Sequence, residues 1–305
     1  MTSSTTERTL NNGTFCNLQV SIWTASKKVP TGEVHLGETD DTLFRVNKDL
    51  ISKQVLKPIR QQAQKANEIL HNRALPFNIR GVYYIPTSNI QSALEAIESY
   101  KTKFWEQVDA FCARYEEYRE EARLRLNGHF RETDYPQSSK IRDKFGWEMQ
   151  MMQFSAPSRL QFVSRDMYNR AMIDFHSRID EFRNSSMALL REKFRELVEH
   201  MQERLTLGED GQRKIFRNSL VTNLREFISD FHSLNITNDT ELEEQVNRVG
   251  ALMNGVEPQQ LRDGTALPQM VSMVLNGVKE QVNTMIVDAP RRRVRFQPQD
   301  QEVAA

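Results

Sequence analysis

Two long stretches of the chain repeat their apolar residues at steps of three and four, and this pattern constrains the fold more than any other feature. The first covers residues 90–126 and the second covers residues 168–205. Such steps place side chains on one face of an α-helix. A helix of roughly 40 residues reaches on the order of 60 Å. We therefore expect two long helices that pack as an antiparallel, coiled-coil-like hairpin, with residues 127–163 as the connection.

A different period precedes the first long helix. Residues 17–24, NLQVSIWT, alternate between two faces, as a half-buried strand does. One face would carry Leu18, Val20 and Ile22, and the other Gln19, Ser21 and Trp23. The next such stretch, IRGVYYIP, covers residues 79–86, and a polar loop and a helix over residues 48–71 separate the two. We expect residues 17–24 to pair with residues 81–85 as a two-stranded β clasp, which must lie against helices because it is marginal alone.

Shorter helices follow the second long one. Apolar periodicity predicts one helix up to Phe231, one from Thr240 to about Met253, and a last one from Leu267 to about Val287. The chain thus reads as a mainly α protein with helical content above roughly 60%. We expect a disordered start at residues 1–13, a strand–helix–strand base at 14–88, the hairpin and C-terminal helices at 89–288, and a disordered tail at 289–305.

Composition limits the environment of the protein. Lys and Arg together number 41, as do Asp and Glu, so the 305-residue chain has a formal net charge of zero. This balance argues against a protein that binds nucleic acid or an anionic membrane over its whole surface. The two cysteines, Cys16 and Cys112, are far apart and have no metal-binding spacing. The sequence also lacks a signal-peptide core and a run of apolar residues long enough for a membrane span. We expect a cytoplasmic protein without a membrane partner.

The motifs that could indicate catalysis are incomplete. Residues 32–39, GEVHLGET, have the glycine spacing of a phosphate-binding loop, but Glu38 stands where such a loop requires a lysine. Glu68 and His71 form half of a di-iron carboxylate motif, and no second Glu-x-x-His occurs. No nucleophile elbow or zinc-protease motif is present. The sequence therefore predicts no catalytic residue, no cofactor and no metal site, although a site assembled only in three dimensions stays open.

One apolar segment is a candidate for contact with another protein. Residues 145–157, FGWEMQMMQFSAP, are rich in methionine, whose flexible side chain adapts to partners. The segment falls at the expected tip between the two long helices. The interaction residues of this hypothesis are Phe145, Trp147, Met149, Met151, Met152 and Phe154. The alternative is that the tip folds back on its own stalk.

The C-terminal tail concentrates positive charge. Its sequence RRRVRF carries Arg291, Arg292, Arg293 and Arg295. Four arginines on an unstructured tail can contact phosphates or an acidic protein surface. Nucleic-acid binding through this tail is therefore an alternative function, although no aromatic platform or recognition helix accompanies it.

The order of these segments also carries a resemblance. The succession of NLQVSIWTASKKV, a polar loop, NKDLISKQVLKPIRQQAQKANEIL, IRGVYYIPTSNIQSALEAI and FWEQVDAFCARYEEYREE resembles a family of uncharacterised phage and bacterial proteins, over about the first two-thirds of the chain. Their genes often stand beside a MoxR-type AAA+ ATPase and a von Willebrand factor A domain protein. The resemblance implies a bacterial or phage-infected cell and a working partnership with these proteins. We expect a non-catalytic adaptor or assembly factor. A homo-oligomer is one form that it can take.

Overall fold

The computed structural model describes residues 9–29, 46–206, 216–264 and 266–287, which form two compact units. The first unit comprises residues 1–182 and the second residues 183–305. The division falls inside one helix, α5 (Arg165–Leu205), whereas the sequence placed its boundary between residues 88 and 89. The expected disordered start overlaps the described residues, because residues 9–11 are helical and Gly13 begins a strand.

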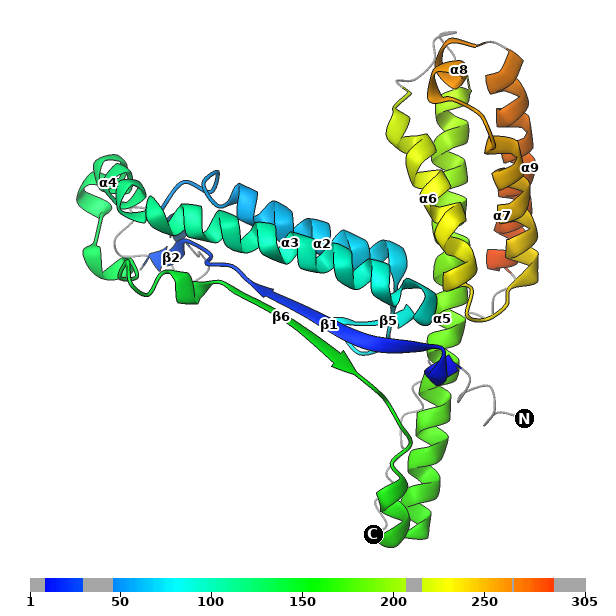
Figure 1. Cartoon of the computed structure of the whole chain (residues 1–305), viewed down its shortest axis with the longest axis horizontal. Coiled ribbons are helices and arrows are strands. Elements are labelled where there is room, and N and C mark those ends of the chain that lie inside the picture. Colours follow the sequence, from blue (N-terminus) through cyan, green and yellow to red (C-terminus); the bar gives the residue numbers. More distant parts are fainter. Residues whose placement is uncertain (1–8, 30–45, 207–215, 265, 288–305) are drawn as a thin grey trace, which may run out of the picture. The chain divides into compact units, whose positions relative to one another are not determined.

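Of the residues that the structure describes, 69% are helical, which confirms the predicted mainly α class. The first unit also holds two antiparallel sheets (Figure 1). Before α5, its strands and α-helices are β1 (Gly13–Ser21), β2 (Ser26–Val29), β3 (Val46–Asp49), α2 (Lys57–Arg73), β4 (Leu75–Pro76), β5 (Val82–Pro86), α3 (Thr87–Ala113), α4 (Tyr115–Leu126) and β6 (Gly146–Met152). Its 3₁₀ turns are η3 (Asn127–His129), η4 (Glu132–Asp134), η5 (Arg142–Lys144) and η6 (Ser158–Phe162).

The predicted strand pair is found only in part, and it belongs to a larger sheet. β5 pairs with residues 13–17 of β1, so within the predicted stretch 17–24 only Asn17 lies opposite β5. β1 pairs antiparallel with β5, with Gly13 opposite Pro86 and Asn17 opposite Val82. The strand order is β4-β5-β1-β6, so β1 has a second neighbour. That neighbour, β6, lies in the segment that the sequence analysis placed at a helical tip. This placement is wrong: residues 146–152 pair with β1 over seven positions.

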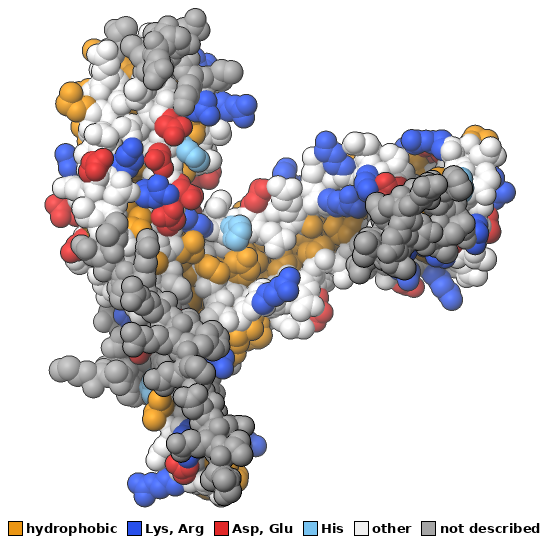
Figure 2. Space-filling view, turned by 180° about the vertical axis from the view of Figure 1, so that it is seen from behind, with side chains coloured by type: hydrophobic (Ala, Val, Ile, Leu, Met, Phe, Trp, Pro, Cys, Tyr) orange, Lys and Arg blue, Asp and Glu red, His pale blue; other side chains and the backbone are white. Residues whose placement is uncertain are grey.

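Helices α2 and α3 lie side by side on one face of this sheet (Figure 1). Leu70 of α2 and Ile97 of α3 are buried with Cys16 of β1 in one apolar cluster. Figure 2 shows hydrophobic side chains in a band along the first unit, where the helices meet the sheet. The helix predicted over residues 48–71 starts later, at Lys57, because residues 46–49 form β3 and Pro58 lies in the first turn of α2.

The structure does not show the expected hairpin of two long helices. The first predicted helix is interrupted at Arg114, which separates α3 from α4. The buried face of α3 is covered by α2 and by the sheet. The last part of α5 is covered instead by helices of the second unit. The 3–4 periodicity therefore identified helices correctly but assigned them the wrong partners.

The second unit is a helical bundle. The C-terminal part of α5 packs there with α6 (Asn218–Leu234), α7 (Thr240–Met253) and α9 (Ala266–Val287), and α8 (Pro258–Asp263) precedes α9 (Figure 1). The last two predicted helices, over residues 240–253 and 267–287, match α7 and α9. Thr240 begins α7 as expected, and Asp239 before it is the N-cap, because its side chain accepts a hydrogen bond from the N–H of Leu242.

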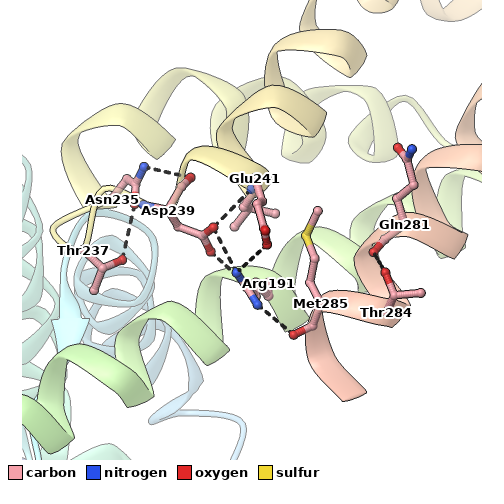
Figure 3. Close-up of polar contacts among 9 residues, drawn as sticks. Arg191, Asn235, Thr237, Asp239, Glu241, Gln281, Thr284 and Met285 are labelled. Carbon is pink, nitrogen blue, oxygen red and sulfur yellow. Dashed lines mark hydrogen bonds and ion pairs between the residues drawn. The ribbon is translucent and has the colours of Figure 1, made fainter. Parts of the chain in front are cut away.

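A buried ion pair joins three helices of this bundle (Figure 3). The guanidinium of Arg191 on α5 donates to both carboxylate oxygens of Asp239, at 2.7 and 3.0 Å, and to the carbonyl oxygen of Met285 on α9, at 2.7 Å. The hydrogen bond to Asp239 raises the pKa of Arg191 above its ordinary value. Arg191 thus fixes the start of α7 and the end of α9 against α5.

Candidate interaction surface

Buried aromatic residues on the face of the four-stranded sheet opposite α2 and α3 anchor the segment that we identify as the candidate site. Phe15 of β1 lies 4.8 Å from Phe77 and 4.8 Å from Phe154, between ring centroids. Phe182 of α5 lies 5.1 Å from Phe77 and 5.5 Å from Tyr84. Edge-to-face packing of this kind stabilises beyond the area that it buries. The chain is therefore held against the sheet at Phe154, just after β6, and again at Phe182, where α5 packs on the same aromatic cluster.

Between these anchors the chain extends without a core of its own. We call residues 155–178 the apolar arm: they include η6 and the first turns of α5, and none of them is fully buried. Four large apolar side chains are exposed there: Phe162 by 82%, Val163 by 75%, Met167 by 53% and Ile173 by 69%. A concentration of exposed apolar side chains is typical of a surface that contacts another molecule.

Local hydrogen bonds explain why the arm turns where it does. Pro157 and Leu160 accept the backbone N–H groups of Leu160 and Val163, both at 3.0 Å, which closes η6. Ser164 then accepts the N–H of Met167 through its hydroxyl oxygen, at 3.4 Å. Ser164 therefore acts as the N-cap of α5, which begins at Arg165. The turn thus places Phe162 and Val163 immediately before the helix and Met167 within it.

The charge of the arm is positive. It carries four arginines, at positions 159, 165, 170 and 178, and two aspartates, at positions 166 and 174, so its formal charge is 4 − 2 = +2 with His176 neutral. Arg170 pairs with Asp166 at 2.9 Å. The arm therefore combines exposed apolar side chains with an excess of cationic ones, which suits an apolar surface bordered by carboxylates.

The side chains that the sequence proposed for protein contact are mostly packed within the chain. Phe145 is buried against Phe111, with 5.6 Å between ring centroids, and Trp147 packs on Phe104 at 5.2 Å. The remaining members are distributed along β6 and its end: Met149 packs on the cluster under α3, Met151 is 45% exposed, Met152 pairs with Phe15, and Phe154 belongs to the aromatic anchor. The six residues do not form one exposed apolar tip.

Other sequence candidates lie outside the described residues. These are the loop at 32–39 with Glu38, and the four arginines Arg291, Arg292, Arg293 and Arg295. In the part of the chain that is described, no group of three or more His, Cys, Asp and Glu side chains could hold a metal ion. His71 instead lies against the ring of Tyr83, with 5.9 Å between centroids.

A hollow beside α4 has its cationic side chains already paired. It is open, has a volume of about 450 Å³, and is lined by apolar residues such as Val55 and Leu126 together with charged ones. The cationic side chains that line it are already paired with carboxylates: the pairs are Lys48 with Asp134, Lys53 with Asp49, and Arg125 with Glu121. A small-molecule site normally presents a few unpaired polar groups in a concave apolar pocket.

The fold and this surface define a class of protein: a predominantly helical chain with a small antiparallel sheet and an exposed apolar arm. A family comparison is more specific. The chain belongs to the DUF3150 family, described as a protein of unknown function, whose model matches residues 10–276. No curated protein and no solved structure matched the chain. Along the described helices, none is both long and apolar enough to cross a membrane.

Proposed function

We propose that this protein is a non-catalytic adaptor or assembly factor, and that its apolar arm is the surface through which it binds a partner protein. The observation that carries the proposal is the exposure of Phe162, Val163, Met167 and Ile173 on a segment with no buried residue. Water-exposed apolar side chains at this density are costly unless a partner covers them. The aromatic anchors at Phe154 and Phe182 support a defined position for the arm.

For the partner we propose a MoxR-type AAA+ ATPase acting with a von Willebrand factor A domain protein. This choice rests on the resemblance described above. In this mechanism the ATPase supplies the work of the system, and the adaptor determines where the work is applied. The excess of two positive charges on the arm favours an apolar patch with an acidic border on the partner.

The size of the effect can be estimated from the four side chains. Burying each large apolar side chain contributes roughly 1.5 to 3 kcal/mol. Four such side chains contribute on the order of 6 to 12 kcal/mol before association costs, which consume much of that gain. A dissociation constant in about the micromolar range is therefore expected. Loss of two of the four exposed apolar side chains should weaken binding by about a hundredfold or more.

The test uses the full chain and the purified ATPase from the same genome. Phe162→Ser combined with Met167→Ser should weaken binding in calorimetric titration while thermal unfolding is unchanged, because both side chains are exposed. Leu124→Ser is a matched control, since Leu124 on α4 is also 82% exposed but lies outside the arm. Equal binding by the double variant and the natural chain would exclude the arm as the contact surface. Failure of the natural chain to bind would exclude this ATPase as the partner.

A further inference from the structure

The outer edge of the four-stranded sheet is open. β6 is the last strand in the order β4-β5-β1-β6, and in the described structure only β1 pairs with it (Figure 1). Open edges expose a row of backbone donors and acceptors, and proteins usually protect them with proline, lysine, a bulge or a covering element. The sequence of β6, GWEMQMM, contains neither proline nor lysine.

The free backbone groups of β6 can be assigned from the hydrogen-bond pattern. The N–H of Thr87 donates to the carbonyl of Asn12, at 2.9 Å, in the register of the β1–β5 ladder. Because bonded and non-bonded pairs alternate in antiparallel sheets, even-numbered residues of β1 direct their backbone groups toward β5 and odd-numbered residues toward β6. The β6 partners of the odd-numbered residues are 146, 148, 150 and 152. The backbone groups of Trp147, Met149 and Met151 therefore point to the open edge.

The side chains of β6 separate by face. Trp147 and Met149 pack on the apolar clusters beneath the helices, and Met151, opposite Cys16, shares their face and is 45% exposed. Glu148 and Gln150 lie on the other face, and Gln150 donates a hydrogen bond to Glu148 at 2.6 Å. An added strand would thus meet apolar side chains on one face and polar ones on the other.

We propose that β6 pairs antiparallel with β6 of a second copy of this chain, centred on Met149. This register places Met149 opposite its own counterpart and Trp147 opposite Met151 of the other copy, so all three residues with free backbone groups form bonded pairs. If the twofold axis is centred on residue 148 or 150 instead, only two of these three residues form hydrogen-bonded pairs. An axis at residue 148 also places Glu148 opposite Glu148 of the other copy, which is repulsive. Centred on Met149, Glu148 faces Gln150 of the other copy.

The strand is therefore complementary to itself in hydrogen bonding, apolar content and charge. The result is an isologous interface with twofold symmetry that joins two sheets into one of eight strands. This inference is independent of the proposed adaptor function, because it uses β6 and not the apolar arm. A two-strand interface is small, so we expect a dissociation constant in about the micromolar range.

Cysteine cross-linking tests the register. Residues 148 and 150 of opposite copies would form a non-bonded pair, with Cα atoms about 4.5 Å apart, which suits a disulfide. Oxidation of a mixture of Glu148→Cys and Gln150→Cys chains should give covalent dimers, whereas each variant alone should not, because its two cysteines would be about 8 Å apart on the diagonal. The native Cys16 and Cys112 are present in every sample. Absence of the mixed cross-link would overturn the proposed register.

Proline substitution tests the edge itself by sedimentation velocity. Met151→Pro removes only an N–H that faces the open edge, so it should raise the dimer dissociation constant by at least about tenfold and leave the monomer folded. Gln150→Pro is the matched control, because it removes an N–H bonded to β1 and should destabilise the monomer. Met151→Lys, which keeps the backbone intact, should also dissociate the dimer. A natural chain that is monomeric at about 100 µM, or a dimer that persists in both Met151 variants, would refute the proposal.

Discussion

Replacing Arg191 by Met should destabilise the second unit strongly. The substitution leaves the Asp239 carboxylate, whose side chain is 4% exposed, without its cation, and the carbonyl of Met285 without a donor. Breaking a buried ion pair in this way costs about 3 to 5 kcal/mol. For a unit that spans residues 183–305, each kcal/mol lowers the melting temperature by roughly 4 °C. We therefore expect a decrease of about 12 °C or more in thermal unfolding followed by circular dichroism, and a loss of about 3 to 5 kcal/mol in urea unfolding.

Two further variants decide whether the cost comes from the unpaired charge. Combining Arg191→Met with Asp239→Asn should recover at least about 1 kcal/mol, because the buried charge is gone and the asparagine still caps α7. Arg170→Met is a control, since Arg170 and Asp166 form an exposed pair worth about 0 to 1 kcal/mol. Losses that add up in the double variant, or an Arg191 variant no worse than the Arg170 variant, would refute this reasoning.

Two other predictions concern the first unit. Burial raises the pKa of Asp134, but hydrogen bonds from Lys27 and Lys48 outweigh this effect and hold it below the ordinary value. The resulting stability is present above the unfolded pKa of about 3.9 and is lost as pH falls through the lower folded pKa. The natural chain and Asp134→Asn should therefore differ in unfolding free energy at pH 7, and this difference should decrease only below about pH 4 and vanish below the folded pKa. Phe182→Ala should lower the unfolding free energy in urea by about 3 to 5 kcal/mol, whereas Phe162→Ala, at an exposed position, should lower it by less than about 0.5 kcal/mol. Equal losses in the two variants would contradict the role of Phe182 as an anchor.

The helices could be predicted from the sequence because their apolar residues recur locally. Residues 240–253 and 267–287 needed only this signal, and the structure has α7 and α9 there. Which helix packs on which is decided by residues far apart in the chain. The similar periodicity on residues 90–126 and 168–205 suggested a mutual pairing, but α3 found its partner in α2. Apolar residues spaced three and four apart specify which face of a helix is buried, but they do not specify which element covers that face.

The strand β6 was missed although its signal is present in the sequence. Trp147, Met149 and Met151 alternate with Glu148 and Gln150, as a strand with two different faces requires. Methionine is not β-branched, and its flexibility suggested an adaptable tip instead. The exposure of the apolar arm had no local signal, because apolar residues at helical spacing look the same whether another helix covers them or not.

Hydrogen–deuterium exchange of the full chain, alone and with the AAA+ ATPase, tests the contact surface most directly. The first turns of α5 should exchange readily in the free protein, since no residue of the arm is fully buried. On binding, we predict slower exchange in peptides that cover residues 158–176 and unchanged exchange in α4, where the control residue Leu124 lies. Slower exchange in α4 or elsewhere, with the arm unchanged, would contradict the assignment of the apolar arm as the binding surface.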